Sequence, residues 1–79
     1  MPVRVQLSPP LWKYVPGYDQ NKGVVLENVE GKTVREIIVD LKIPLQEVLV
    51  IMINSYPGKP SSVVKDGDFL ILAKILGGG

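Results

Sequence analysis

Apolar and polar residues alternate at the start of the chain, in the order Val3-Arg4-Val5-Gln6-Leu7. This period-two pattern is typical of a strand with one buried face and one solvated face. The sequence therefore predicts a first strand over residues 3–7. A second apolar run, at positions 24–26 and 29, predicts a second strand that ends at the turn around Gly31.

The stretch between these two strands is rich in proline. Pro9, Pro10 and Pro16 exclude a long regular helix or strand there, because proline fixes φ and lacks an N–H group. Trp12 and Tyr14 are apolar enough to fold back on the core. We predict a packed loop with one helical turn, in which both aromatic rings cover the core rather than stack on a ligand.

A helix is predicted from Thr33 onward. Thr33 and Glu36 have the spacing of a capping box, in which each side chain satisfies a backbone N–H group of the other residue. Four apolar residues follow at positions i, i+3, i+4 and i+7 and form one stripe: Val34, Ile37, Ile38 and Leu41. Pro44 predicts the end of the helix, since the residue before a proline avoids helical geometry.

The segment after the helix predicts a buried strand and a turn. Val48–Ile53 is apolar without alternation, which is typical of a strand covered on both faces or shielded by a partner. Residues 54–60 contain two prolines and a glycine and therefore turn; we interpret Asn54 as a turn residue. Residues 61–64 could form a short edge strand.

Residues 65–68, Lys65-Asp66-Gly67-Asp68, predict a tight turn. Gly67 supplies the positive φ angle, and the aspartates bond to the local backbone. Two neighbouring acids could also suggest a metal ligand or an acid–base pair, but no third ligand lies nearby in the sequence. We interpret this segment as a turn and predict no metal site.

The last predicted strand, residues 69–75, has apolar side chains on both faces. One face holds Phe69, Ile71, Ala73 and Ile75, and the other holds Leu70, Leu72, Lys74 and Leu76. If Phe69 and Ile71 meet the helix, Leu70 and Leu72 lie on the open sheet face near Arg4. An apolar patch with a basic rim is typical of a docking surface. We therefore predict partner binding by Leu70, Leu72, Lys74, Leu76 and Arg4; the alternative is that residues 8–22 simply cover this face.

The predicted order is strand, strand, helix, strand, short strand, strand. One helix with one apolar stripe can cover one face of one sheet, which favours an α+β fold of the β-grasp kind. We expect a mixed four- to five-stranded sheet with one main helix packed on one face, and with the first and last strands parallel at its centre. Residues 1–76 form this β-grasp domain, and residues 77–79 form a glycine tail.

The composition narrows the classes of function. The 79 residues contain no cysteine and no histidine, so disulfides, thiolate nucleophiles and imidazole bases are excluded. The net charge is +1 and the nine basic residues are scattered, which predicts no nucleic-acid partner. No apolar run approaches the roughly 20 residues of a membrane span. We expect a small cytoplasmic domain that is not bound to a membrane.

The chain ends in Gly77-Gly78-Gly79, directly after the last strand. Glycine lacks a β-carbon, so such a tail can enter a slot that is too narrow for other residues. Three residues can carry the terminal carboxylate about 10 Å beyond the domain. The alternative is an ordinary frayed chain end.

Together, these features resemble the MoaD and ThiS sulfur-carrier family, which has a ubiquitin-like β-grasp fold. The resemblance covers nearly the whole chain. It depends on the strand Arg4-Val5-Gln6-Leu7, the following Leu11-Trp12-Lys13-Tyr14-Val15-Pro16-Gly17, the Asp66-Gly67-Asp68 turn and the terminal glycines. The glycine tail and the Asp-Gly-Asp turn are its most specific elements.

The resemblance implies a protein cosubstrate rather than an enzyme. An E1-like adenylyltransferase, which uses ATP, would adenylate Gly79, and a sulfur donor would then convert the adenylate into a thiocarboxylate. The large subunit of a cofactor synthase would consume the sulfur. The carrier itself would bind no cofactor. The opening segment favours molybdopterin synthesis, with thiamine or tungsten-cofactor synthesis as alternatives.

Two departures from the family pattern leave the pathway open. A third glycine precedes the usual terminal pair, so Gly77 is a spacer or Gly79 is trimmed. The tail also lacks the prolines common in MoaD, which makes it more similar to ThiS. Two other functions remain open: a ubiquitin-like modifier conjugated to target lysines through Gly79, and a β-grasp RNA-binding module, which the near-neutral charge disfavours.

Overall fold

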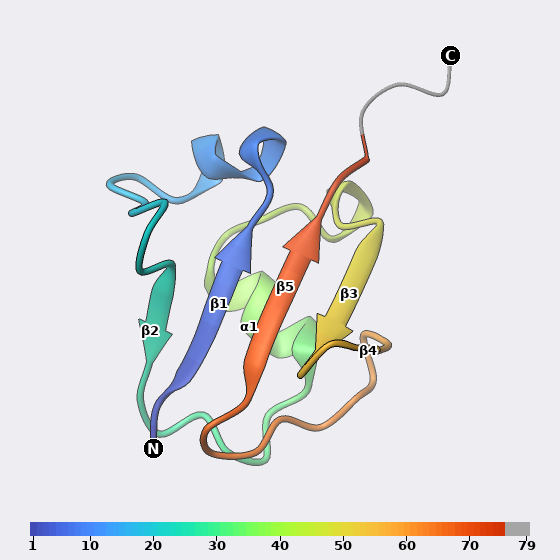
Figure 1. Ribbon diagram of the computed structural model, residues 1–79. Helices are drawn as coiled ribbons and strands as arrows, with labels where there is room; N and C mark the ends of the chain where they lie inside the picture. The colour runs from blue at the N-terminus through green and yellow to red at the C-terminus, as the bar shows by residue number, and fades with distance from the viewer. Residues whose placement is uncertain (76–79) are drawn as a thin grey trace.

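The computed structural model describes residues 1–75, which form a five-stranded sheet with one α-helix behind it (Figure 1). The strands are β1 (Val3–Leu7), β2 (Val24–Leu26), β3 (Val50–Ile53), β4 (Tyr56–Pro57) and β5 (Phe69–Ala73). Their order in the sheet is β2-β1-β5-β3-β4. β1 and β5 pair in parallel at the centre, and the other pairs are antiparallel. The predicted α+β, β-grasp architecture is therefore confirmed.

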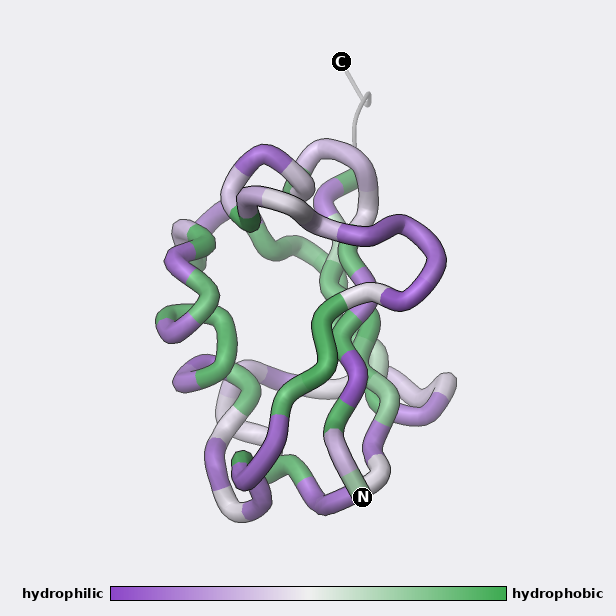
Figure 2. The backbone as a smooth tube through the Cα atoms, turned by 90° about the vertical axis from the view of Figure 1, so that its left-hand side faces the viewer, coloured by the Kyte–Doolittle hydropathy of each residue, from purple (hydrophilic) through white to green (hydrophobic). Residues whose placement is uncertain are grey.

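The helix α1 (Val34–Asp40) forms the second layer of the molecule. Figure 2 shows the sheet from its edge, with α1 on one side of it. Two short 3-10 helices, η1 (Pro9–Tyr14) and η2 (Leu45–Glu47), complete the structure. η1 is the helical turn predicted within the proline-rich loop. Among residues 1–75, no helix has the length and apolar character that crossing a bilayer requires.

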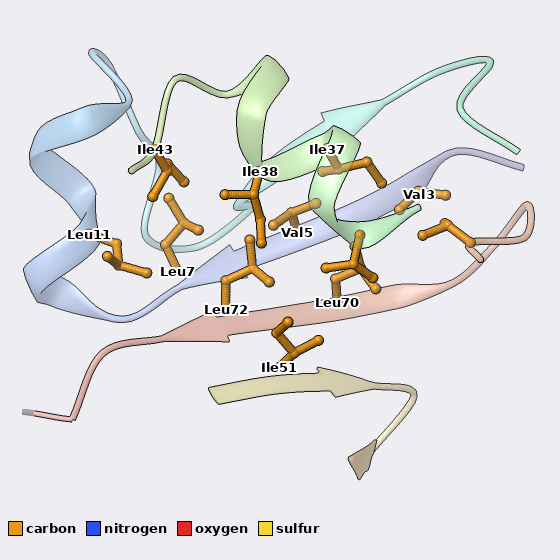
Figure 3. Packing of buried hydrophobic residues seen from close by; sticks show 12 residues of the cluster. Val3, Val5, Leu7, Leu11, Ile37, Ile38, Ile43, Ile51, Leu70 and Leu72 are labelled. Carbon is orange, nitrogen blue, oxygen red and sulfur yellow. The ribbon is translucent and has the colours of Figure 1, made fainter. Parts of the chain in front are cut away.

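The core lies between α1 and the sheet, as Figure 3 shows. It consists of Val3, Val5, Leu7, Leu11, Val34, Ile37, Ile38, Ile43, Ile51, Val64, Leu70 and Leu72. The inward positions of β1 are those that the sequence pattern predicted, as are Val34, Ile37 and Ile38 of the predicted helix stripe. Leu41, the fourth member of that stripe, is the C-cap residue beyond α1 and is only partly buried against the core. No buried polar or charged residue is present in this described core.

The predicted capping box opens α1. The hydroxyl of Thr33 accepts a hydrogen bond from the Glu36 N–H at 3.2 Å, and the Glu36 carboxylate accepts one from the Thr33 N–H at 3.0 Å. Both side chains thus satisfy backbone donors that the first turn leaves without a helical partner.

The predicted end of α1 at Pro44 is wrong, because the helix ends at Asp40. Lys42 has a φ of 63°, and its N–H donates to the Val39 carbonyl at 2.9 Å. The N–H of Ile43 donates to the Ile38 carbonyl at 3.2 Å. These two bonds form a Schellman motif, which closes the helix before the proline is reached.

Two predictions on the second half of the sheet are also wrong. The strand predicted over residues 48–53 begins only at Val50, since η2 precedes it, and Val50 and Met52 are only half-buried rather than covered. Residues 61–64 form no strand; Val63 makes an isolated bridge to Thr33. The edge strand is β4 instead, reached through a two-residue turn at 54–55 in which both φ angles are positive.

Candidate functional site

The reacting residue predicted from the sequence, Gly79, lies outside the described residues, as do Leu76, Gly77 and Gly78. The structure describes the part of the chain that leads to them. β5 ends at Ala73, two residues earlier than predicted, and Lys74 and Ile75 follow. The candidate site is therefore built from the end of β5 and from the sheet surface around that strand.

The prediction that Leu70 and Leu72 lie on the open sheet face is wrong. Both side chains are fully buried, and Figure 3 shows them pointing from β5 toward α1. The register with β1 explains this, because Leu70 lies beside Val5 and Leu72 beside Leu7. Both faces of β5 are apolar, whereas β1 has only one apolar face, so β1 decides which face of β5 is buried.

The open face of the sheet is the surface opposite α1. Residues paired across neighbouring strands lie on the same face of the sheet, so the strand pairing identifies the members of the open face. They are Val25, Arg4, Gln6, Phe69, Ile71, Ala73, Val50, Met52 and Pro57. None of these positions holds an acidic residue. Arg4 is exposed, as predicted, and its guanidinium lies 4.9 Å from the centre of the Phe69 ring. The open face thus presents apolar side chains, the polar amide of Gln6 and one cation, Arg4.

Lys74 is half-buried at the end of β5 and forms an ion pair with Glu47 of η2. Its Nζ atom lies 2.6 Å from Glu47 Oε1, and the Tyr14 hydroxyl donates to the same oxygen at 3.4 Å. The hydrogen bond from Lys74 lowers the pKa of Glu47, and the same bond raises the pKa of Lys74. Both groups therefore stay charged across the neutral range.

The aromatic residues of the proline-rich loop pack on the core, as predicted. Trp12 and Tyr14 are half-buried against it. The Trp12 indole N–H donates to the Leu7 carbonyl at 2.8 Å, and its ring stacks on Tyr18 with the centroids 5.8 Å apart. Both rings thus cover the core, and the Trp12 indole finds its hydrogen-bond partner within the fold.

Residues 65–68 form the predicted turn, with a φ of 83° at Gly67. The Asp68 carboxylate accepts hydrogen bonds from the Lys65 N–H and from the Asn54 side-chain amide, both at 2.8 Å. Asn54 in turn accepts a bond from the Phe69 N–H at 2.9 Å. Within residues 1–75, no three histidine, cysteine or acidic side chains gather where they could hold a metal ion.

Sequence reasoning missed three residues around the site: Asn54, Glu47 and Ser8. Asn54 ties the β3–β4 turn to the start of β5, whereas its sequence context indicated only a turn. Glu47 and Ser8 contact Lys74 from positions 27 and 66 residues away in the chain. No local pattern signals contacts over such separations.

A separate pocket of about 510 Å³ lies where the loop at residues 59–61 passes the start of α1. It is lined by Thr33, Arg35, Lys59, Pro60 and Ser61. None of the site residues predicted from the sequence lines it.

Comparison with protein families gives one match over nearly all of the described chain. A family model described as Mut7-C ubiquitin matches residues 1–73. The match contains every strand described above. A comparison with curated proteins gives no match.

Comparison with solved structures identifies a protein of the same fold. The matching chain belongs to a protein–protein complex of subunits 1 and 2 of the molybdopterin-converting factor from Helicobacter pylori 26695. The alignment covers 100% of both chains with 23% sequence identity and a TM-score of 0.60. At this identity the similarity shows a shared fold, which agrees with the ubiquitin-like β-grasp topology predicted from the sequence.

Proposed function

Because the chain belongs to the Mut7-C ubiquitin family, we propose that it works as a ubiquitin-like sulfur carrier whose terminal glycine is activated by a partner enzyme. The observation that supports this most is the position of β5. It is a central strand of the sheet, paired with β1 and β3, and Gly77–Gly79 follow it within a few residues. A well-anchored strand is thus joined through only three residues, Lys74, Ile75 and Leu76, to residues without side chains.

The proposed chemistry takes place at the carboxylate of Gly79. An E1-like adenylyltransferase binds ATP, the carboxylate oxygen attacks the α-phosphorus, and pyrophosphate leaves. Sulfide from the sulfur donor then attacks the carbonyl carbon of the acyl-adenylate, a C–S bond forms and AMP leaves, so the glycine carboxylate becomes a thiocarboxylate. Activation is needed because a free carboxylate is a poor electrophile. The carrier contributes the reacting group and its positioning, while the partner enzyme contributes ATP and the catalytic residues.

The open face is the surface that we propose for docking. It replaces the set predicted from the sequence, since Leu70 and Leu72 belong to the core. Phe69, Ile71 and Met52 supply apolar area, and Arg4 supplies the charge. We therefore expect the partner enzyme to offer a surface that is apolar at its centre and acidic where it meets Arg4.

A cofactor-synthesis pathway is the proposed destination of the sulfur. The solved complex of the same fold contains two subunits of a molybdopterin-converting factor. We propose a corresponding larger synthase subunit as the acceptor for this chain and favour molybdopterin over thiamine or tungsten-cofactor synthesis.

The function is tested by incubating the purified chain with ATP, a verified cognate activating enzyme and a sulfur donor, followed by intact-mass analysis. The untreated sample establishes whether the chain ends at Gly79. The expected product is heavier by the difference between sulfur and oxygen, and a variant without Gly78 and Gly79 shows no such gain. An unchanged mass with an active cognate enzyme would overturn the proposal.

Affinity purification from cells distinguishes sulfur delivery from protein conjugation. A carrier is recovered free or with a synthase subunit, whereas a modifier is recovered as covalent ladders on other proteins. RNA binding that survives deletion of Gly78 and Gly79 would instead support a binding module, in which the glycines have no role.

The docking surface is tested with two matched substitutions of apolar residues. Ile71→Ser changes the open face, and Val39→Ser changes an apolar position of α1 that is 59% exposed. We expect Ile71→Ser to raise the KM of the activating enzyme for the carrier about tenfold, as for a central interface residue. We expect no change for Val39→Ser. Equal KM values for the two variants would place the docking surface elsewhere.

A further inference from the structure

Lys74 is held by two segments that lie far from it in the sequence. Its backbone N–H donates to the Ser8 hydroxyl at 3.0 Å, and its ammonium group donates to Glu47 at 2.6 Å. Ser8 lies between β1 and η1, and Glu47 is the last residue of η2. The first residue after β5 is therefore fixed from both sides.

The two preceding residues are held by Ser8 and by Leu49, which follows η2 and precedes β3. The Ser8 N–H donates to the Leu72 carbonyl at 3.1 Å, and the Leu49 N–H donates to the Ala73 carbonyl at 2.9 Å. Leu72 is thus hydrogen-bonded to Ser8, Ala73 to Leu49, and Lys74 to both Ser8 and Glu47. Ile75, which comes next, has 66% of its surface exposed.

The Lys74–Glu47 ion pair is less exposed than the Lys32–Asp40 pair, which is the other ion pair among residues 1–75. The side chains of Lys74 and Glu47 are 30% and 25% exposed, and the Tyr14 hydroxyl also binds the carboxylate. Lys32 and Asp40 are 41% and 56% exposed, and their contact at 2.8 Å joins surface side chains. A partly buried pair with an additional hydrogen bond holds its geometry better than an exposed pair.

We propose that Ser8, Glu47 and Lys74 form a clamp that positions the end of β5, and through it the terminal glycine, for reaction in the partner's active site. This inference rests on the proposed function. The clamp is distinct from the open face, since Glu47 and Ser8 belong to the segments that flank the end of β5. Its members are positioning residues, because they act through the chain that leads to Gly79.

The expected effect follows from the geometry of activation. The carboxylate must meet the α-phosphorus of ATP at a fixed distance and angle, and small misplacements of a reacting group lower the rate strongly. Docking through the open face does not involve the clamp. Loss of the clamp therefore lowers kcat for adenylation and leaves the KM for the carrier unchanged.

The test is ATP–pyrophosphate exchange by a cognate activating enzyme, with kcat and KM measured for Lys74→Met, Glu47→Gln, Ser8→Ala, Lys74→Arg and Lys32→Met. We expect Lys74→Met and Glu47→Gln to lower kcat about ten- to a hundredfold at constant KM. Ser8→Ala removes one hydrogen bond and should lower kcat less. Lys74→Arg retains the ion pair and should keep most of the activity, and Lys32→Met should match the wild type. Circular dichroism establishes that each variant is folded.

Other outcomes would overturn either the clamp or the proposed function, and the assay distinguishes the two. A raised KM for Lys74→Met with a wild-type Glu47→Gln variant would mean that Lys74 contacts the enzyme directly, and the clamp would be wrong. Wild-type kcat for both variants would also overturn the clamp while leaving the proposed function intact. No activation of the wild-type chain would overturn the proposed function and, with it, the role of the clamp.

Discussion

The hydroxyl of Tyr18 accepts a hydrogen bond from the backbone N–H of Leu7 at 2.7 Å. The pairing of β1 with β2 ends at Val5, so Leu7 has no strand partner on that side. On that side, the Tyr18 hydroxyl accepts the hydrogen bond from the Leu7 N–H, and the Trp12 indole N–H donates to the Leu7 carbonyl. Two stacked aromatic side chains thus replace the missing strand and satisfy a partly buried backbone.

Tyr18→Phe should destabilise the fold because it removes the partner of the Leu7 N–H and keeps the ring. An unsatisfied backbone donor costs about 1 to 3 kcal/mol. The matched control is Tyr56→Phe, at a tyrosine that is 74% exposed, where a change within about 0.5 kcal/mol is expected. Urea denaturation measures both. Equal losses would mean that the Tyr18 hydroxyl is not needed for folding.

Ile38→Ala should lower the free energy of unfolding by about 2 to 5 kcal/mol, since it leaves a cavity between α1 and the sheet. Ile38 has no exposed surface, whereas its neighbour Val39 is 59% exposed. Val39→Ala is therefore the control and should have a small effect. Chemical denaturation of both variants checks the result, and an unchanged midpoint for Ile38→Ala would contradict the packing of α1.

A comparison of the stabilities of Gly23→Ala and Gly17→Ala should distinguish the effect of a steric clash from that of backbone strain. Both glycines have positive φ, 70° and 75°, so either substitution strains the backbone by about 1 to 2 kcal/mol. A Cβ atom at Gly23 would also lie 2.5 Å from the Val5 carbonyl oxygen, while nothing lies within 4 Å at Gly17. Gly23→Ala should lower the melting temperature clearly more than Gly17→Ala. A reversed order would contradict the close approach of this loop to β1.

The Glu47–Lys74 ion pair should stabilise the fold only in the pH range in which the Glu47 carboxylate and the Lys74 ammonium group are both charged. The pKa of Glu47 is lowered in the fold, so its contribution is complete above its unfolded pKa of about 4.3 and is lost as the pH falls through its lower folded pKa. The pKa of Lys74 is raised, so its contribution is complete below about 10.4 and is lost as the pH rises through its higher folded pKa.

Melting temperatures of the wild type and of Glu47→Gln, measured across this pH range, check the ion-pair prediction. Their difference should be constant around neutral pH and should shrink at both extremes. The exposed pair is the control, and Asp40→Asn should show a smaller difference throughout, because solvent screens exposed charges. A difference that does not vary with pH would mean that charge is not the source of the stability.

Deletion of Gly78 and Gly79 should abolish activation and leave the stability of the domain unchanged. Among residues 1–75, the last member of the buried core is Leu72 and the last strand ends at Ala73. Thermal denaturation of the shortened chain checks the stability, and the exchange assay checks the activity. A lower melting temperature would show that these residues contribute to the fold.

The sequence predicted those features that depend on neighbouring residues. The capping box of Thr33 and Glu36, the apolar stripe of α1 and the turn at Gly67 all form as predicted. Each is built from contacts between residues three or four positions apart or closer, where helix and turn geometry determine which groups meet. The two-layer β-grasp arrangement followed because one stripe can cover only one sheet face.

Tertiary structure decided the features that depend on distant segments. Alternation along β5 shows two apolar faces, and only pairing with Val5 and Leu7 of β1 turns Leu70 and Leu72 inward. The Glu47–Lys74 contact likewise exists because η2 packs beside the end of β5. The physical reason is that a residue pattern determines which side chains share a face, whereas burial of that face depends on which strand becomes its neighbour.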